Sequence, residues 1–294
     1  MYIGRFAPSP TGPLHFGSLV AAVASYADAR AAMGQWLLRI EDVDTTRCSR
    51  AAETEILRQL SAYGFVSDGN VIRQSERGEI YETAIMRLAD AGHVFACICS
   101  RRMLETAPRN FDGETIYPGT CRDCGVRAGA HSLRLRVKKS GDSRVQFADR
   151  VTGVITQNVA TDVGDFVLRR ADGCYAYQLA VVLDDAFQGI TDIVRGEDLL
   201  MNTPRQIYLQ RRLGVATPTY LHVQLVRNAG GEKLSKQTLA QAISVDAPVT
   251  TLCAAWAFLK QTDLGRVESV DAFWKAAIAA WAPQILQAHR RSHK

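Results

Sequence analysis

Residues 5–18 read RFAPSPTGPLHFGS, a proline-rich loop between a short apolar run and a helix-forming stretch. Its three prolines hold the backbone extended, because each ring fixes φ and disfavours helix in the residue before it. The following helix begins near His15, where unpaired amide groups and the positive end of the helix dipole favour an anion. His15 can hydrogen-bond a phosphate there, and Gly17 leaves bare backbone against which a flat ring can lie. A plain helix N-cap without a ligand is the alternative.

The chain around this loop alternates between strand-like and helix-like runs. Such alternation favours a parallel sheet with helical crossovers, that is, a Rossmann-like α/β fold. Apolar and periodic runs predict the elements in this order: strand 2–6, helix 15–33, strand 36–40, helix 49–63, helix 78–91 and strand 94–96.

The rhythm changes after residue 96. Residues 97–165 hold a cysteine cluster and short β-like runs, which predicts an insertion, and alternation then resumes with helix 177–187, strand 190–194, helix 203–213 and strand 220–225. We therefore expect four parts: a first half of the Rossmann domain, an inserted subdomain, the second half of the Rossmann domain, and a lysine loop with a helical C-terminal region. Their ranges are 1–96, 97–165, 166–228 and 229–294.

A second candidate motif lies far along the chain, where residues 231–237 read GEKLSKQ. Lys233 and Lys236 flank a serine beside a glycine pair. A loop of this kind can bring cations onto a polyphosphate while charge develops during displacement. Taken alone, the motif is read as a solvated basic loop, and its functional reading depends on the rest of the chain.

Composition sets mild limits on the partner and the compartment. The chain carries 35 basic and 30 acidic residues, a net charge of +5. Such an excess suits a phosphate backbone as partner, although ordinary solubility explains it as well. No stretch approaches the roughly 20 apolar residues of a membrane span, and the N-terminus lacks the apolar core of a signal peptide. We expect a cytoplasmic protein, without membrane contact and monomeric.

Four of the seven cysteines lie between residues 97 and 124. In a reducing compartment this clustering favours a metal over disulfides. Spacing alone would select four thiolates, namely Cys97, Cys99, Cys121 and Cys124, as a tetrahedral structural zinc site. Reduced cysteines without a metal are the alternative.

Together the two motifs resemble the signatures of class I aminoacyl-tRNA synthetases, HFGS at residues 15–18 and KLSKQ at residues 233–237. The first loop, RFAPSPTG, is similar to the glutamyl and glutaminyl branch. Residues 38–42 (LRIED) and residues 193–198 (IVRGED) extend the same resemblance. Because the motifs occur in one consistent order over nearly the whole chain, they are far more specific together than singly.

The resemblance implies a glutamate pocket and an ATP site. Two guanidinium groups suit the carboxylates of glutamate, and a carboxylate suits its ammonium group. The residues implied for L-glutamate are Arg5, Ala7, Ser9, Glu41, Tyr177 and Arg195. Those implied for ATP and catalysis are His15, Gly17, Ser18, Lys233 and Lys236.

The implied chemistry is adenylation, in which the glutamate carboxylate attacks the α-phosphorus of ATP and pyrophosphate leaves. Mg²⁺ accompanies the ATP, and positioning and electrostatics supply most of the acceleration. The attacking carboxylate is already ionised, so neither a side-chain nucleophile nor a dedicated base is required.

Only 57 residues follow Gln237, too few for the helical anticodon-binding region of an ordinary glutamyl-tRNA synthetase, so we expect no such domain. In this respect the chain resembles the truncated glutamyl-queuosine tRNA(Asp) synthetases, which place glutamate on queuosine in the anticodon of tRNA(Asp). That family's pattern implies one structural Zn²⁺ held by Cys97, Cys99, Tyr117 and Cys121, with Cys124 as the rival fourth ligand.

Two other functions stay open from the sequence. One is a truncated glutamyl-tRNA synthetase that still charges the 3′ end of a tRNA. The other is a non-catalytic module that binds glutamate and ATP but has lost turnover. The intact His15, Gly17 and Lys236 favour an enzyme.

Overall fold

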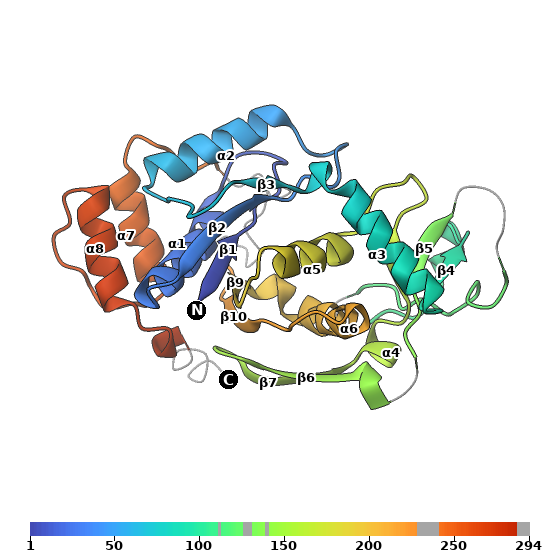
Figure 1. The fold of residues 1–294 in the computed structure, drawn as a ribbon. Helices are drawn as coiled ribbons and strands as arrows, with labels where there is room; N and C mark the ends of the chain where they lie inside the picture. The colour runs from blue at the N-terminus through green and yellow to red at the C-terminus, as the bar shows by residue number, and fades with distance from the viewer. Residues whose placement is uncertain (111–112, 126–130, 139–140, 228–240, 287–294) are drawn as a thin grey trace.

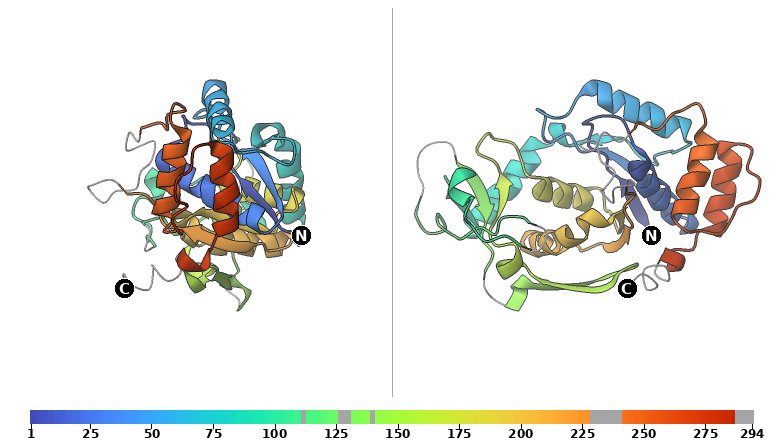
Figure 2. Two further views of the ribbon diagram at one scale, coloured as in Figure 1. Left: turned by 90° about the vertical axis from the view of Figure 1, so that its left-hand side faces the viewer. Right: turned by 180° about the vertical axis from the view of Figure 1, so that it is seen from behind.

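The computed structural model describes residues 1–110, 113–125, 131–138, 141–227 and 241–286. The molecule is elongated, with a strand-and-helix core in the middle (Figure 1). The C-terminal helices lie at one end and a small antiparallel sheet at the other, an arrangement that the rear view also shows (Figure 2). Among the described residues, no helix combines the length and apolarity needed to cross a bilayer.

The first half of the core is a parallel three-stranded sheet in the order β1-β2-β3. Helix α1 crosses from β1 to β2, and its buried alanines let it lie close to the strands. The elements are β1 (Ile3–Phe6), α1 (Phe16–Ala31), β2 (Gln35–Ile40), α2 (Arg50–Ala62), β3 (Ile72–Arg73), the 3-10 turn η1 (Gln74–Glu76) and α3 (Gly78–Asp90).

The second half is a four-stranded sheet in the order β7-β6-β10-β9. Its edge strand β9 lies beside β1, and the backbone N–H of Thr191 donates to the carbonyl of Ile3 at 2.9 Å. The two halves therefore meet at β1 and β9. The elements are β6 (Arg144–Asp149), β7 (Gly153–Asn158), α4 (Val159–Asp162), α5 (Tyr177–Phe187), β9 (Asp192–Gly196), η4 (Glu197–Asn202), α6 (Thr203–Leu213) and β10 (Thr219–Val223).

A separate antiparallel sheet, in the order β4-β5-β8, carries the cysteine cluster. The prediction that residues 94–96 add a strand to the parallel sheet is wrong, because this strand pairs with β5 instead. The third parallel strand is β3, which was not predicted because two residues are too short to show a pattern. The elements of this part are β4 (Val94–Cys97), η2 (Arg102–Leu104), β5 (Ser132–Leu135), η3 (Gly141–Ser143) and β8 (Phe166–Arg169).

The insertion was expected to begin at residue 97 and to end at residue 165, but strands pair across both boundaries. Strand β4, which begins before residue 97, pairs with β5 inside the expected insertion. The hairpin β6–β7 lies within 97–165 but extends the main sheet through β10, which pairs in parallel with β6. Strand β8 lies beyond residue 165 but pairs with β5. The division into domains therefore stays a prediction, whereas the sheet to which each strand belongs is a property of the structure.

The C-terminal region packs on α1. Helices α7 (Pro248–Phe258) and α8 (Val270–Ala280) both contact α1 at one end of the molecule (Figure 1). The indole of Trp274 is buried against Tyr26 and Phe65, with ring centroids 4.6 and 5.1 Å away, and its N–H donates to the carbonyl of Tyr63 at 2.8 Å. This packing joins the C-terminal helices to the first half of the core.

Candidate active site

A cavity of about 490 Å³ opens where β1, β9 and β10 end. In a parallel α/β sheet this edge, at the carboxyl ends of the strands, is the usual place for a ligand. Three segments line the cavity: the proline-rich loop with the start of α1, the turn after β9, and the end of β10. The lining residues are Phe6, Ala7, Pro8, Ser9, Thr11, Leu14, His15, Gly17, Ser18, Ala21, Gly196, Asp198, Leu199, Val223, Gln224, Leu225 and Val226.

His15 caps the first turn of α1 and faces this cavity. The backbone N–H of Ser18 donates to His15 Nδ1 at 3.3 Å, and the Ser18 hydroxyl lies 3.1 Å from Nε2. No acidic residue occupies the first turn of α1, so its positive dipole is not offset locally. The capping role and a phosphate-binding role are compatible, because both use the same end of the helix.

The chain returns to this cavity after the lysine motif. Lys233 and Lys236 themselves lie outside the described residues. On one side of them Val226 lines the cavity, and on the other Ala242 forms a bridge with His15. Gln59 fixes this second contact: its side chain accepts from the Leu14 N–H at 2.8 Å and donates to the Ile243 carbonyl at 3.0 Å.

A buried network of charges lies next to the first loop. The Arg5 Nε and Arg39 Nη1 atoms reach the same oxygen of Asp185, at 3.2 and 2.9 Å. Arg39 Nη2 also lies 3.3 Å from Glu41 Oε1. Burial alone would raise the pKa of Asp185, but the charges of Arg5 and Arg39 outweigh it and hold the pKa below its usual value.

Glu41 and Tyr177 have environments that differ from that of Asp185. Burial raises the pKa of Glu41 above its usual value of 4.5, although Arg39 and Arg5 oppose the shift. Burial and the negative charge of Glu41 raise the pKa of Tyr177 to about 12. Tyr177 is therefore a protonated phenol at neutral pH, able to donate a hydrogen bond.

Arg195 approaches the same region from β9. Its side chain is 5% exposed, and its Nη2 donates to Thr203 Oγ1 at 2.8 Å and to Gln206 Oε1 at 2.9 Å. Its Nη1 is buried and has no hydrogen-bond partner within the described part of the chain. A buried guanidinium nitrogen without a partner is costly, and a ligand carboxylate would satisfy it.

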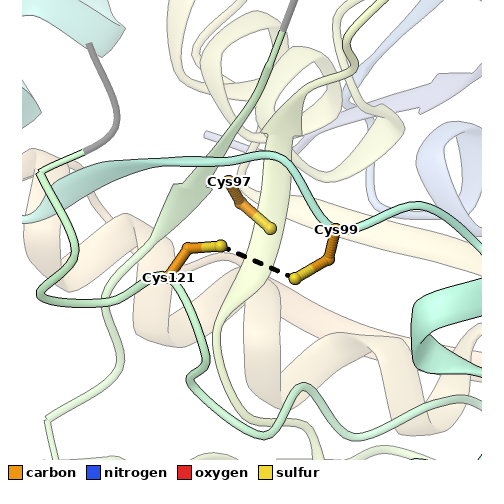
Figure 3. Close-up of side chains that lie close together, drawn as sticks. All are labelled: Cys97, Cys99 and Cys121. Atoms are coloured by element: carbon orange, nitrogen blue, oxygen red, sulfur yellow. Dashed lines mark hydrogen bonds between the residues drawn. The ribbon is translucent and has the colours of Figure 1, made fainter.

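The cysteine cluster lies in the antiparallel sheet, away from this cavity. Figure 3 shows the sulfur atoms of Cys97, Cys99 and Cys121 converging, and they lie within 4.8 Å of one another. The Tyr117 hydroxyl is 3.3 Å from Cys97 Sγ and 3.6 Å from Cys99 Sγ. Cys124 is exposed, and its thiol donates to the Thr120 carbonyl at 2.9 Å instead. Three sulfur atoms and one phenol oxygen therefore lie close together, and the three thiols form a group that could hold a metal ion.

The comparisons with known proteins agree with this geometry. A family profile described as "tRNA synthetases class I (E and Q), catalytic domain" matches residues 3–251. A protein of Thiobacillus denitrificans called glutamyl-Q tRNA(Asp) synthetase is 53% identical over 280 residues, 95% of this chain and 91% of that protein.

This chain belongs to the glutamyl-Q tRNA(Asp) synthetase family, within the class I tRNA synthetases.

A second member of the family, from Janthinobacterium, is 52% identical over 97% of this chain and 98% of its own length. Among solved structures, a glutamate tRNA ligase from Elizabethkingia meningosepticum, in complex with its amino acid, is 27% identical with a TM-score of 0.68. The match covers 80% of this chain but only 52% of that ligase. Methionyl-tRNA synthetase of Mycobacterium tuberculosis shares the fold alone, with 14% identity and a TM-score of 0.52 over 86% of this chain and 64% of that one.

The synthetase fold brings together most of the residues singled out in the sequence. Ala7, Ser9, His15, Gly17 and Ser18 all line the cavity. Arg5 and Glu41 belong to the buried charge network beside it. The negative charge of Glu41 and the positive charge of Arg195 both act on the phenol of Tyr177.

Several buried polar residues of this region were not predicted from the sequence. Three of them could have been noticed as a charged or polar side chain within a largely apolar strand or helix, where an unpaired charge would be expensive. Asp185 interrupts the apolar helix α5, Arg39 interrupts β2, and His222 interrupts β10. Others in the region are Gln59, Asp149, Asp184, Thr203 and Gln206.

Replacing Asp185 with Ala should lower the free energy of unfolding by about 3–5 kcal/mol, because two buried guanidinium groups lose their shared partner. A denaturant titration followed by tryptophan fluorescence measures this change. Asp172→Ala is the matched control, since it removes a carboxylate that is paired with Arg170 in solvent. Equal unfolding midpoints for the two variants would mean that the buried network does not stabilise the core.

Proposed function

We propose that the chain activates L-glutamate with ATP, releases pyrophosphate, and transfers the glutamyl group to queuosine in the anticodon of tRNA(Asp). The observation that carries this proposal is the adjacency of two sites at one edge of the sheet. A cavity at the N-terminus of α1 lies next to a buried group of polar side chains that includes Arg5, Glu41 and Tyr177. The family relatives, called glutamyl-Q tRNA(Asp) synthetases, support the same acceptor.

Glutamate has two carboxylates and one ammonium group, and the buried pocket offers a complement to each. Arg5 and Arg195 supply guanidinium groups for the carboxylates. Glu41 accepts from the ammonium group, and the Tyr177 phenol donates a further hydrogen bond. Ala7 and Ser9, on the loop between the two sites, complete the amino-acid pocket.

ATP occupies the cavity at the start of α1 in this proposal. The first amides of the helix, with the side chains of His15 and Ser18, hold the phosphates, and Gly17 leaves space for a flat ring. Lys233 and Lys236 neutralise charge on the phosphates as pyrophosphate departs. Mg²⁺, bound with ATP, spreads the charge of the polyphosphate.

The protein's main contribution to the chemical step is then positioning. Holding the ionised carboxylate of glutamate against the α-phosphorus turns an encounter of two molecules into a reaction within one complex. Because the attacking oxygen already carries its charge, no side chain has to remove a proton.

The RNA site that accepts the glutamyl group can be identified with a tRNA that lacks its 3′ end. Labelled glutamate and ATP are incubated with tRNA(Asp) that carries queuosine, with the same tRNA lacking the modification, and with modified tRNA(Asp) lacking its 3′-terminal CCA. We expect label on both queuosine-containing RNAs and none on the unmodified one. Label that requires the CCA end would identify a truncated glutamyl-tRNA synthetase. Absence of glutamate-dependent ATP–pyrophosphate exchange would identify a binding module.

We also propose that Cys97, Cys99, Tyr117 and Cys121 hold one structural Zn²⁺ and that this ion stabilises the inserted antiparallel sheet. The support is the convergence of these four side chains and the position of Cys124 outside the cluster. The Arg134 guanidinium lies 4.0 Å from the centroid of the Tyr117 ring. Burial raises the pKa of Cys97, but hydrogen bonding from Tyr117 and the charge of Arg134 outweigh it and lower the pKa to about 7. Burial raises the pKa of the neighbouring Cys99 to about 11, so the support for a metal here is the geometry of the cluster.

The fourth ligand can be assigned by measuring bound zinc after dialysis against a chelator. Cys124→Ser should keep one zinc per chain, whereas Cys121→Ser and Tyr117→Phe should lose it much faster than the wild-type protein. These losses follow from removing one of four donors to the ion. If Tyr117→Phe holds zinc like the wild type while Cys124→Ser does not, the tyrosine assignment is wrong.

Binding of the glutamate ammonium group should weaken as pH falls, starting above pH 4.5, because protonation of Glu41 removes its negative charge. Glu41→Gln should raise the KM for glutamate roughly 10- to 100-fold at pH 7.5, matching the loss of a charged hydrogen bond of about 1.5–3 kcal/mol. It should also flatten the rise in the KM for glutamate as the pH is lowered from 7.5 toward the usual glutamate pKa of 4.5. Protonation of the substrate glutamate affects the KM of the wild type and of the variant alike. If the KM for glutamate depends on pH in the same way in both proteins, Glu41 is not the group that binds the ammonium group.

A further inference from the structure

A chain of three buried side chains crosses the second half of the sheet. Asp149 stands at the end of β6, His222 on β10, and Arg195 on β9, where it is the direct register partner of His222. Their exposed fractions are 3%, 0% and 5%. None of the assigned roles involves His222 or Asp149, and polar groups buried this deeply need a reason to be there.

The ring of His222 is held in one tautomer. Its Nδ1 lies 2.7 Å from Asp149 Oδ2, and its backbone N–H donates to the same oxygen at 3.1 Å. The other oxygen of Asp149 accepts from the backbone N–H groups of Val151 and Thr152 at 3.0 and 2.7 Å. Because this carboxylate has only acceptor capacity, the His222 proton must lie on Nδ1.

The opposite nitrogen of the ring is consequently an acceptor. Arg195 Nε donates to His222 Nε2 at 3.1 Å. A charged imidazolium could not accept this bond, and burial lowers the pKa of His222 to about 4 in spite of the opposing charge of Asp149. The ring is therefore neutral at physiological pH, with a lone pair directed at the guanidinium.

Two of the three nitrogen atoms of the Arg195 guanidinium are already hydrogen-bonded within the protein. Nε is bound to His222, and Nη2 is bound to Thr203 and Gln206. Only Nη1 is left, buried and without a partner in the described residues. The planar group can thus present a single nitrogen to a ligand, in a direction set by its other bonds.

We propose that His222, oriented by Asp149, is a positioning residue that fixes the Arg195 guanidinium so that Nη1 meets a carboxylate of glutamate. This rests on the proposed function, in which Arg195 binds glutamate. His222 itself does not touch the substrate. It acts through Arg195, by accepting a hydrogen bond that would otherwise be lost and by preventing the guanidinium from rotating.

Two substitutions of His222 by amide side chains test its bond to Asp149 and its bond to Arg195 separately. The Asn amide reaches about as far as Nδ1, so His222→Asn keeps the bond to Asp149 and loses the acceptor for Arg195. The Gln amide reaches about as far as Nε2, so His222→Gln keeps that acceptor. We expect H222N to raise the Kd and KM for glutamate at least tenfold with the KM for ATP within twofold. H222Q should stay within threefold of wild type for both substrates.

A double-mutant cycle distinguishes positioning from simple packing. If His222 acts through Arg195, adding H222N to Arg195→Met should change the Kd for glutamate by less than twofold, because there is no guanidinium left to orient. A further tenfold loss in that background would overturn the proposal. So would a loss of ATP and glutamate affinity in equal measure, accompanied by a lower unfolding midpoint.

Glutamate affinity is measured by titration calorimetry as well as by ATP–pyrophosphate exchange. Wild-type protein that binds glutamate without exchange would contradict the proposed function but would still test His222. Should H222N fail to fold, Asp149→Asn replaces it. With its amide oxygen kept on the N–H groups of Val151 and Thr152, the NH2 group takes the place of Oδ2, gives up the bond from the His222 backbone N–H, donates to Nδ1 and shifts the ring proton to Nε2. The acceptor for Arg195 is then lost, and the same tenfold weakening is expected. An unchanged Kd for glutamate in that variant overturns the proposal.

Discussion

The paired charges of Arg5, Arg39 and Asp185 are the constraint on which the active-site region depends. All three side chains are at most 5% exposed, and an ion removed from water is tolerated only when a partner replaces its hydration. The three residues come from β1, β2 and α5, so the pairing can form only when these elements have their native order. The chemistry of the pocket and the packing of its walls are therefore parts of the same arrangement.

The two guanidinium groups proposed to bind glutamate, those of Arg5 and Arg195, are held in different ways. Arg5 shares the charge of Asp185, whereas the atoms bonded directly to Arg195 belong to neutral groups: a histidine ring, a hydroxyl, an amide and a carbonyl. Neutral hydrogen-bond partners fix the orientation of the guanidinium group without offsetting its positive charge. Arg195 can thus be both immobilised and left with its full attraction for a carboxylate, while Arg5 contributes a charge already partly compensated.

The sequence predicted those parts of the fold that depend on residues close together in the chain. Residues 5–18 and the alternation of strands and helices predicted the core, because turns, caps and apolar periodicity act over a few residues. The range of α6, Thr203–Leu213, was predicted to the residue. The strands with which β4 and β6 pair were not predicted, because strand pairing is decided by contacts between segments far apart in sequence. For the same reason Glu41 could be singled out from its motif, while Asp185 and His222 became visible only with their neighbours in place.

The segment that contains the lysine motif leaves and rejoins the described structure at two different halves of the sheet. Val226 follows β10 in the second half, whereas Ala242 and Ile243 are fixed to His15 and Leu14 in the first half, with Gln59 joining them. Val226, Leu14 and Ile243 nevertheless belong to one buried apolar cluster, so the packing of the core joins the two attachment points. Both described ends of the lysine segment are therefore anchored at the wall of the cavity, and a substitution that loosened this cluster would disturb them together.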